Sequence, residues 1–209
     1  MHLYAKYSTH AHTISIPRLR PASDFALREV PYPVSDSELK KIVAVLRLSV
    51  PSAVIVASTR EAAPLRAELI RCGATQLSAG SRTNPGGYSQ AAGSLEQFST
   101  NDHRPLSEVI RAVIDDGLLP SLCTTCYRVG RTGQSFTEKT MGGGMGPLCQ
   151  ANALLTLKEY LHEHRSGADA VAIESAIEKG LMDVKDEQLK KALIEKLAEI
   201  DQGKKDLYF

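Results

Sequence analysis

The sequence lacks a long apolar run, an imbalance of charge and a dense set of cysteines. No stretch of its 209 residues approaches the roughly 20 apolar positions that a membrane helix needs. Lys+Arg 25 against Asp+Glu 24 give a formal net charge of +1, which argues against binding through a basic surface. We therefore expect no membrane and no nucleic acid among its partners. The segment before residue 12 has no apolar core of the signal-peptide kind, so the expected location is cytoplasmic.

The composition is that of an ordinary globular protein. Hydrophobic residues make up 43% and charged residues 23% of the chain, so disorder is not indicated. The length suits one large domain, or one and a half, with a substantial buried core. The cysteines number 4, too few for a disulfide scaffold, and they are unevenly placed. Cys72 stands alone and is expected to be an inert buried thiol.

The first half of the chain alternates β-branched runs with helical patterns. The continuous run from Ser52 to Ala57 is typical of a strand buried on both faces. Ser35 and Glu38 have the spacing of a capping box, which predicts a helix that begins there and continues to about residue 50. The other predicted elements are short strands over 12–17 and 75–79 and a helix over 62–72. Strand, helix and strand joined by tight turns predict parallel βαβ units.

The second half is predicted to be mainly helical. A loop rich in Gly, Ser and Asn over 80–101 leads into a helix over 106–116. Numerous glycines predict an irregular segment over 123–147, because glycine disfavours the interior of a helix or strand. The other expectations are a short strand over 119–122 and helices over 151–164, 168–181 and 186–202. About three βα units are present where a closed (β/α)8 barrel needs about eight, so any barrel here is partial.

Three cysteines are candidate ligands of a metal centre. Cys123, Cys126 and Cys149 form the pattern C-x2-C-x22-C. Two thiolates three positions apart can bind one metal centre, and the third returns after the glycine-rich segment. Thiolates are soft ligands that favour zinc or an iron–sulfur cluster. A four-iron cluster held by three thiolates leaves one iron free for an exogenous ligand.

The spacing alone leaves two other interpretations open. A structural zinc site would need a fourth ligand, for which the candidates are His103, His162 and His164. A redox C-x-x-C pair would consist of Cys123 and Cys126, and Cys149 would then have no part in the site. Arg128 and Arg131 flank the cysteines, where positive charge would stabilise thiolates, although both are equally compatible with solvated loop charges.

The cysteines lie in a longer stretch that resembles a known family. Residues 123–133, Cys-Thr-Thr-Cys-Tyr-Arg-Val-Gly-Arg-Thr-Gly, and residues 149–156, Cys-Gln-Ala-Asn-Ala-Leu-Leu-Thr, strongly resemble the C-terminal domain of the HydG family of [FeFe]-hydrogenase maturases. Residues 12–22, 31–36 and 78–88 resemble the later barrel strands of that family. The resemblance covers nearly the whole chain from residue 12 onward, including its ending over 203–209.

The resemblance implies an α/β fold. The last βα units of a radical S-adenosylmethionine (radical SAM) barrel would occupy residues 1–120, and a mostly helical auxiliary cluster domain would occupy 121–209. It also implies a carbon–carbon lyase that cleaves tyrosine to p-cresol and dehydroglycine. The same family helps to form iron-bound carbon monoxide and cyanide for assembly of the hydrogenase H-cluster. The related 2-iminoacetate synthases of thiamine synthesis share the upstream motifs but lack the cysteine motif.

The metal ligands follow from the same resemblance. Cys123, Cys126 and Cys149 would hold an auxiliary [4Fe-4S] cluster. His12 would ligate an extra labile iron near that cluster, although a histidine on a strand is more often a hydrogen-bonded structural residue.

Arginines that follow the predicted strands are candidates for substrate binding. Arg82, with Ser81, is the candidate for the tyrosine carboxylate, because a fixed guanidinium forks well onto a carboxylate. Arg18 and Arg60 also end strands and could serve tyrosine or the methionine part of S-adenosylmethionine. Each of these arginines could instead be an ion-pair partner or a solvated surface charge.

One family motif is missing from the sequence. The C-x3-C-x2-C motif, whose [4Fe-4S] cluster binds and cleaves S-adenosylmethionine, has no counterpart among the cysteines. We therefore expect the C-terminal half of a lyase, as a fragment or as one part of a split enzyme, that needs an N-terminal barrel half to act. Its partners would be tyrosine, that missing half and other hydrogenase maturation proteins. The alternatives are a non-catalytic iron–sulfur or zinc carrier module and a 2-iminoacetate synthase.

Overall fold

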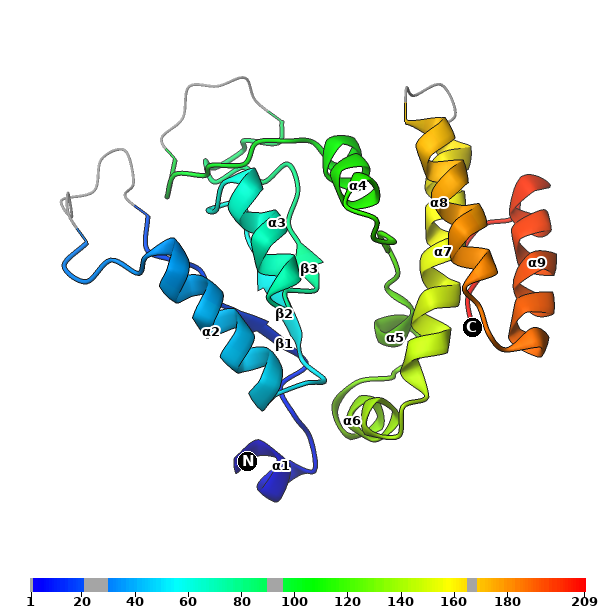
Figure 1. The fold of residues 1–209 in the computed structure, drawn as a ribbon, viewed down its shortest axis with the longest axis horizontal. Helices are drawn as coiled ribbons and strands as arrows, with labels where there is room; N and C mark the ends of the chain where they lie inside the picture. The colour runs from blue at the N-terminus through cyan, green and yellow to red at the C-terminus, as the bar shows by residue number, and fades with distance from the viewer. Residues whose placement is uncertain (1, 21–29, 90–95, 165–168) are drawn as a thin grey trace. The chain divides into compact units, whose positions relative to one another are not determined.

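The computed structural model describes residues 2–20, 30–89, 96–164 and 169–209 (Figure 1). The chain forms two compact units. The first unit runs from His10 to Leu106, and the second combines residues 2–9 with Ser107–Phe209. The compact units divide after Leu106, and the domain boundary expected at residue 120 stays a prediction.

The first unit is an α/β unit built on a parallel sheet. Its elements are, in chain order, β1 (Thr13–Ser15), α2 (Asp36–Ser49), β2 (Val54–Ala57), α3 (Ala63–Arg71) and β3 (Gln76–Leu77). The three strands lie in the order β1-β2-β3, and both pairings are parallel. Ile14 stands opposite Ile55, and Val56 stands opposite Gln76. The predicted parallel βαβ arrangement is therefore confirmed.

Helix α2 begins where the capping box predicts. The backbone N–H of Glu38 donates to Ser35 Oγ at 3.2 Å, and the backbone N–H of Ser35 donates to Glu38 Oε2 at 2.8 Å. The two side chains thus satisfy donors that the first turn would otherwise leave unpaired. The helix ends at Ser49, ahead of Val50 and Pro51, because proline cannot continue the backbone hydrogen bonding.

The core of the first unit lies between β2 and the two crossover helices. Ile55 and Ala57 alternate with less buried valines along β2, so one face of the strand contacts the helices. The buried residues of this core are Leu39, Val43, Ile55, Ala57, Leu65, Leu69 and Ala74. Cys72 is half-buried and packs against the same core, as a structural thiol would.

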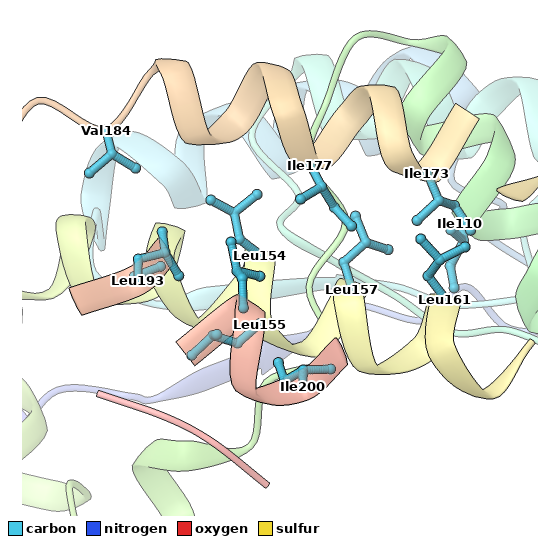
Figure 2. Packing of buried hydrophobic residues seen from close by; sticks show 12 residues of the cluster. Ile110, Leu154, Leu155, Leu157, Leu161, Ile173, Ile177, Val184, Leu193 and Ile200 are labelled. Carbon is cyan, nitrogen blue, oxygen red and sulfur yellow. The ribbon is translucent and has the colours of Figure 1, made fainter. Parts of the chain in front are cut away.

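The second unit consists of helices. They are α1 (His2–Tyr7), α4 (Leu106–Asp115), α5 (Thr125–Arg128), α6 (Gly133–Met141), α7 (Met145–Glu163), α8 (Ala170–Met182) and α9 (Glu187–Asp201). Figure 2 shows how leucines of α7 pack between isoleucines of α8 and side chains of α9. Leu154, Leu155 and Leu157 are completely buried there, so α7 is the central helix of this core. None of the described helices is long and apolar enough to cross a membrane.

Two predictions for the second half are wrong. Residues 119–122 form no strand; the backbone N–H of Leu122 donates to the side chain of Thr156 at 3.2 Å instead of to a neighbouring strand. The segment over 123–147 is not irregular, because it contains α5, α6 and the start of α7. Its glycines stand mostly at helix junctions: Gly142 ends α6, Gly143 has a positive φ of 73°, and Gly144 precedes α7.

The last two helices agree with their predictions. The predicted start of α8 at residue 168 lies outside the described residues, and the helix begins at Ala170. The apolar face of α9 packs on α7, with Leu193 and Ile200 almost fully buried.

Candidate functional site

The three cysteines of the motif all lie in the second unit. Cys123 precedes α5, Cys126 lies inside α5, and Cys149 lies in the first turns of α7. None of the three forms a disulfide. The segment around α5 and the first turns of α7, separated by α6, thus supply three thiols that form no disulfide within one compact unit.

The thiols are close enough to influence one another electrostatically. Although Cys149 as a residue is exposed, partial desolvation of its sulfur raises the pKa of the thiol, and the neighbouring Cys126 and Cys123 raise that pKa further. Burial likewise raises the pKa of Cys126, with Cys123 acting in the same direction. The positive charge of Arg131 opposes both increases. The pKa values of Cys126 and Cys149 therefore shift the same way, towards the neutral thiol, and Arg131 is the group that favours the thiolate.

Hydrogen bonds fix the Cys123–Cys126 segment. Cys123 Sγ lies 3.2 Å from Thr125 Oγ1, and the backbone N–H of Thr125 donates to Cys123 Sγ at 3.4 Å. The backbone N–H of Arg131 donates to the carbonyl of Cys126 at 2.8 Å. The backbone N–H of Thr125 is thus a donor to Cys123 that would stabilise its thiolate.

The donor set suits an iron–sulfur cluster chemically, since three thiols that form no disulfide, each a soft ligand, belong to one compact unit. Among the described residues, no three His, Cys, Asp or Glu side chains are arranged to hold a single metal ion. Of the histidines considered for a zinc site, His103 lies 3.2 Å from Thr100 Oγ1 through Nδ1, and His164 Nδ1 lies 2.9 Å from the carbonyl oxygen of Tyr160. The case for an iron–sulfur cluster therefore rests on the number and softness of the three thiols, and not on an assembled site for a single metal ion.

The candidate substrate arginines follow the three strands of the first unit. Arg18 comes after β1, Arg60 after β2, and Arg82 with Ser81 after β3. Because the strands are parallel, all three arginines follow carboxyl ends that meet at one edge of the sheet. The sheet thus brings these segments to a common edge, and their role in substrate binding stays a prediction.

Arg18 is engaged by protein acceptors. Its Nε donates to both carboxylate oxygens of Glu61 at 3.1 and 3.0 Å. Its Nη1 donates to Asp36 Oδ1 at 2.7 Å and to the carbonyl of Val34 at 2.9 Å. Arg20 binds the same Glu61 through Nη2 at 3.0 Å. The geometry therefore gives Arg18 the ion-pair role, one of the two roles that its place after a strand allowed.

Arg60 and Arg82 have no ion-pair partner among the residues that the structure describes. The guanidinium of Arg60 lies over the ring of Phe98, 3.7 Å from its centroid, and Asn101 Nδ2 donates to the Arg60 carbonyl at 3.1 Å. The side chain of Arg82 is exposed, and its backbone N–H donates to Tyr88 Oη at 3.1 Å. Ser81 is half-buried beside it. Both guanidinium groups thus retain donors for a carboxylate ligand.

A buried ion network, which no sequence motif indicates, supports this edge. Arg66, 1% exposed, donates to Asp102 and to the carbonyl of Ser78, which follows β3. Arg104 donates to both carboxylate oxygens of Asp102, at 2.9 and 2.7 Å. The backbone N–H of Gly80 donates to the Arg104 carbonyl at 3.0 Å. The network therefore holds the backbone that leads into Ser81 and Arg82. Its only sequence signal was a charged residue on the buried face of α3.

His12 lies at the other end of the sheet. It precedes β1, and its carbonyl accepts a hydrogen bond from the backbone N–H of Val54 at 2.8 Å. Partial burial lowers the pKa of its imidazole, which favours the neutral form that binds metals. His12 belongs to the first unit and the cysteines to the second, so its ligand role stays a prediction.

Comparison with known proteins adds a family and two groups of relatives. Residues 15–119 match the model of the Biotin and Thiamin Synthesis associated domain. The chain is 33% identical over 118 residues to the 2-iminoacetate synthase of Escherichia coli (strain K12), covering 56% of this chain and 31% of that protein. The corresponding enzyme of Salmonella typhimurium is 33% identical over 114 residues, covering 54% of this chain and 30% of its own length.

Two solved structures extend the likeness beyond that region. The crystal structure of HydG, a maturase of the [FeFe]-hydrogenase, matches 100% of this chain at 40% identity with a TM-score of 0.92. HydG from Carboxydothermus hydrogenoformans matches 94% of it at 36% identity with a TM-score of 0.73. The chain covers 45% and 41% of these proteins, so it spans less than half of either maturase. The likeness is to their C-terminal part, as the sequence motifs predicted.

Proposed function

Because the chain belongs to the Biotin and Thiamin Synthesis associated domain family, we propose that it is the C-terminal part of a HydG-like radical SAM tyrosine lyase. In this proposal it carries the auxiliary iron–sulfur site of an enzyme that cleaves tyrosine to p-cresol and dehydroglycine. The products would supply carbon monoxide and cyanide to iron during assembly of the hydrogenase H-cluster. One observation carries the proposal. The same chain contains the matched associated domain and, in its helical unit, three cysteine thiols that form no disulfide.

The extent of the matches favours a maturase over a 2-iminoacetate synthase. The family model ends at residue 119, before Cys123, and the match to the Escherichia coli synthase covers 56% of the chain. The match to HydG covers 100% of it, cysteines included. The segment that bears the thiols is therefore the segment that supports the maturase assignment.

Cys123, Cys126 and Cys149 would hold a [4Fe-4S] cluster as thiolates. When bound, such a cluster offers its one iron without a cysteine ligand to an exogenous group. Thr125 donates to the sulfur of Cys123, and Arg131 provides positive charge beside Cys126 and Cys149. Both interactions favour the charged form that binds iron.

The sheet edge of the first unit would bind the amino-acid substrate. Arg82 would form a bidentate contact with the tyrosine carboxylate, with Ser81 as a further donor. Arg60, held over Phe98, would be a second cation at this edge, while Arg18 would hold the edge together through Glu61. S-adenosylmethionine and its own [4Fe-4S] cluster would require the C-x3-C-x2-C motif of an N-terminal barrel half. Other hydrogenase maturation proteins would be the partners that receive the product.

A chimera tests this proposal. The N-terminal part of HydG from Carboxydothermus hydrogenoformans would be fused to this chain, reconstituted anaerobically with iron and sulfide, and given tyrosine, S-adenosylmethionine and a reductant. We expect p-cresol by chromatography from the chimera. Arg82→Gln should lower its yield about tenfold or more, because one bidentate charge-assisted pair is lost.

A matched variant separates the two sites. Cys149→Ala should leave p-cresol formation in place while it abolishes carbon monoxide, detected by its binding to deoxymyoglobin. No p-cresol from a folded and iron-loaded chimera would contradict the lyase assignment, and the cluster-carrier alternative would then be preferred.

A further inference from the structure

The C-terminal residues lie across the helices that bear the cysteines. Beyond α9, Asp206 pairs with Arg128 of α5 at 2.9 Å, and the backbone N–H of Leu207 donates to Glu159 of α7 at 3.3 Å. The ring of Tyr208 lies 5.4 Å from the Arg128 guanidinium. Residues 203–209, called the C-terminal tail below, therefore contact both α5 and α7.

The last residue of the tail joins the two cysteine-bearing segments directly. The backbone N–H of Phe209 donates to Asn152 Oδ1 at 2.9 Å, and Asn152 Nδ2 donates back to the Phe209 carbonyl at 3.4 Å. Arg131 Nη1 donates to the same carbonyl at 3.0 Å. Asn152 is 4% exposed, so this amide is buried and committed to the backbone of Phe209.

Both anchors are neighbours of cysteines. Asn152 lies three positions after Cys149 on α7, and the backbone of Arg131 binds the carbonyl of Cys126. On the other side, the contact from Leu122 to Thr156 ties the residue before Cys123 to α7. The Cys123–Cys126 segment is thus fastened to α7 at both ends, and at one end the link passes through Phe209.

We propose that Phe209 is a positioning residue for the iron–sulfur site: bound by Asn152 and Arg131, it sets the spacing between the Cys123–Cys126 segment and Cys149. Three thiolates bind one cluster only when their separation matches it, so groups that orient ligands control metal affinity. This inference rests on the proposed function, because it assumes that the three thiols bind iron.

The experiment removes Phe209 from the full chain. The protein and its variant lacking residue 209 would be reconstituted anaerobically, and iron loss to an excess of chelator would be followed by absorbance. We expect loss about tenfold faster from the shortened chain, the usual scale for removal of a group that orients a ligand. We also expect a broadened electron paramagnetic resonance (EPR) spectrum of the reduced protein, which reports the cluster's geometry and not merely fold stability.

Two matched variants make the test specific. Lys205→Ala removes the tail's ion pair with Glu163 on α7, away from the cysteines, and should retain the parent rate and spectrum. Asn152→Ala should reproduce the loss seen without Phe209, and the combined variant should be no worse than either, because Asn152 acts through Phe209.

Several outcomes would overturn the inference. It fails if the folded chain without Phe209 keeps the parent rate and spectrum, or if Lys205→Ala loses iron equally fast. Should removal of Phe209 prevent folding, Arg131→Lys retains the positive charge and weakens the contact to the Phe209 carbonyl; unchanged iron release from it would contradict the inference. If the parent chain itself takes up no iron, the proposed cluster function fails instead.

Discussion

Arg66 and Asp102 form a buried ion pair, although 36 residues separate them in the sequence. Both side chains are 1% exposed. Arg66 also binds the carbonyl of Ser78, so the pair links helix α3 to the backbone beyond β3. The stability of the proposed substrate edge is therefore coupled to one carboxylate.

Removal of that carboxylate's charge should destabilise the chain. Asp102→Asn leaves the guanidinium of Arg66 buried without its counter-ion, which typically costs about 3 kcal/mol or more. Urea unfolding followed by circular dichroism measures the change. Asp115→Asn, which removes an exposed pair with Arg111, is the control and should change stability by less than about 1 kcal/mol. Equal effects of the two substitutions would contradict the buried-pair account.

The same carboxylate should make stability depend on pH. Burial opposes ionisation of Asp102, but hydrogen bonds from Arg104 and Arg66 outweigh it and hold its pKa well below the ordinary value. A carboxyl with a folded-state pKa below its unfolded value stabilises the fold fully above the unfolded value, about 3.9, and loses that contribution as pH falls through the folded value.

Urea titrations between about pH 6 and about pH 2 test this dependence. The stability advantage of the parent over Asp102→Asn should be constant near neutrality and shrink at the acid end. An advantage that grows as the pH falls would contradict the predicted direction.

Arg18 should contribute to stability through its fork geometry. Lysine at this position cannot reproduce the contacts to Glu61 and Asp36 together, because an ammonium group is a point charge. We expect Arg18→Lys to lower the free energy of unfolding by about 1–2 kcal/mol. Lys40→Ala, which removes an exposed pair with Glu68, should be nearly neutral. An unchanged unfolding midpoint for Arg18→Lys would show that the contacts of Arg18 do not contribute to the stability of the fold.

Two glycines in the helical unit should respond in opposite ways to alanine. A Cβ at Gly180 would lie 2.7 Å from Leu154 Cδ2, so Gly180→Ala should force α8 away from α7 at a cost of about 1–3 kcal/mol. A Cβ at Gly146, in the first turn of α7, meets nothing within 4 Å. Gly146→Ala should therefore be neutral or stabilise the helix by up to about 1 kcal/mol. Thermal unfolding compares the pair, and a milder effect at Gly180 than at Gly146 would contradict the packing described.

Local chemistry made much of the fold predictable. The β-branched run at β2 and the capping box at Ser35 specify their elements within a few residues. The apolar spacing of α9 specifies the face that packs on α7. The glycines before α7 led to a wrong prediction of an irregular segment. A high glycine content is found both at helix junctions and in loops, and the sequence does not show which backbone conformation each glycine adopts.

The candidate site was predictable only in part. The spacing of Cys123, Cys126 and Cys149 identified the thiols, since ligand spacing is a local property. The pairing of Arg66 with Asp102 and the anchoring of Phe209 by Asn152 join residues far apart in the chain. Such contacts depend on how elements pack, and no periodicity or motif in one sequence encodes them.

The decisive property of this protein is iron binding by the three cysteines. Iron and acid-labile sulfide per chain would be measured after anaerobic reconstitution, together with the EPR spectrum of the reduced protein, for the parent and for Cys123→Ala, Cys126→Ala, Cys149→Ala and Cys72→Ala. We expect about four irons and four sulfides per chain for the parent and Cys72→Ala, and loss of the cluster in the other three. Zinc in place of iron, or full iron loading of Cys149→Ala, would contradict this expectation.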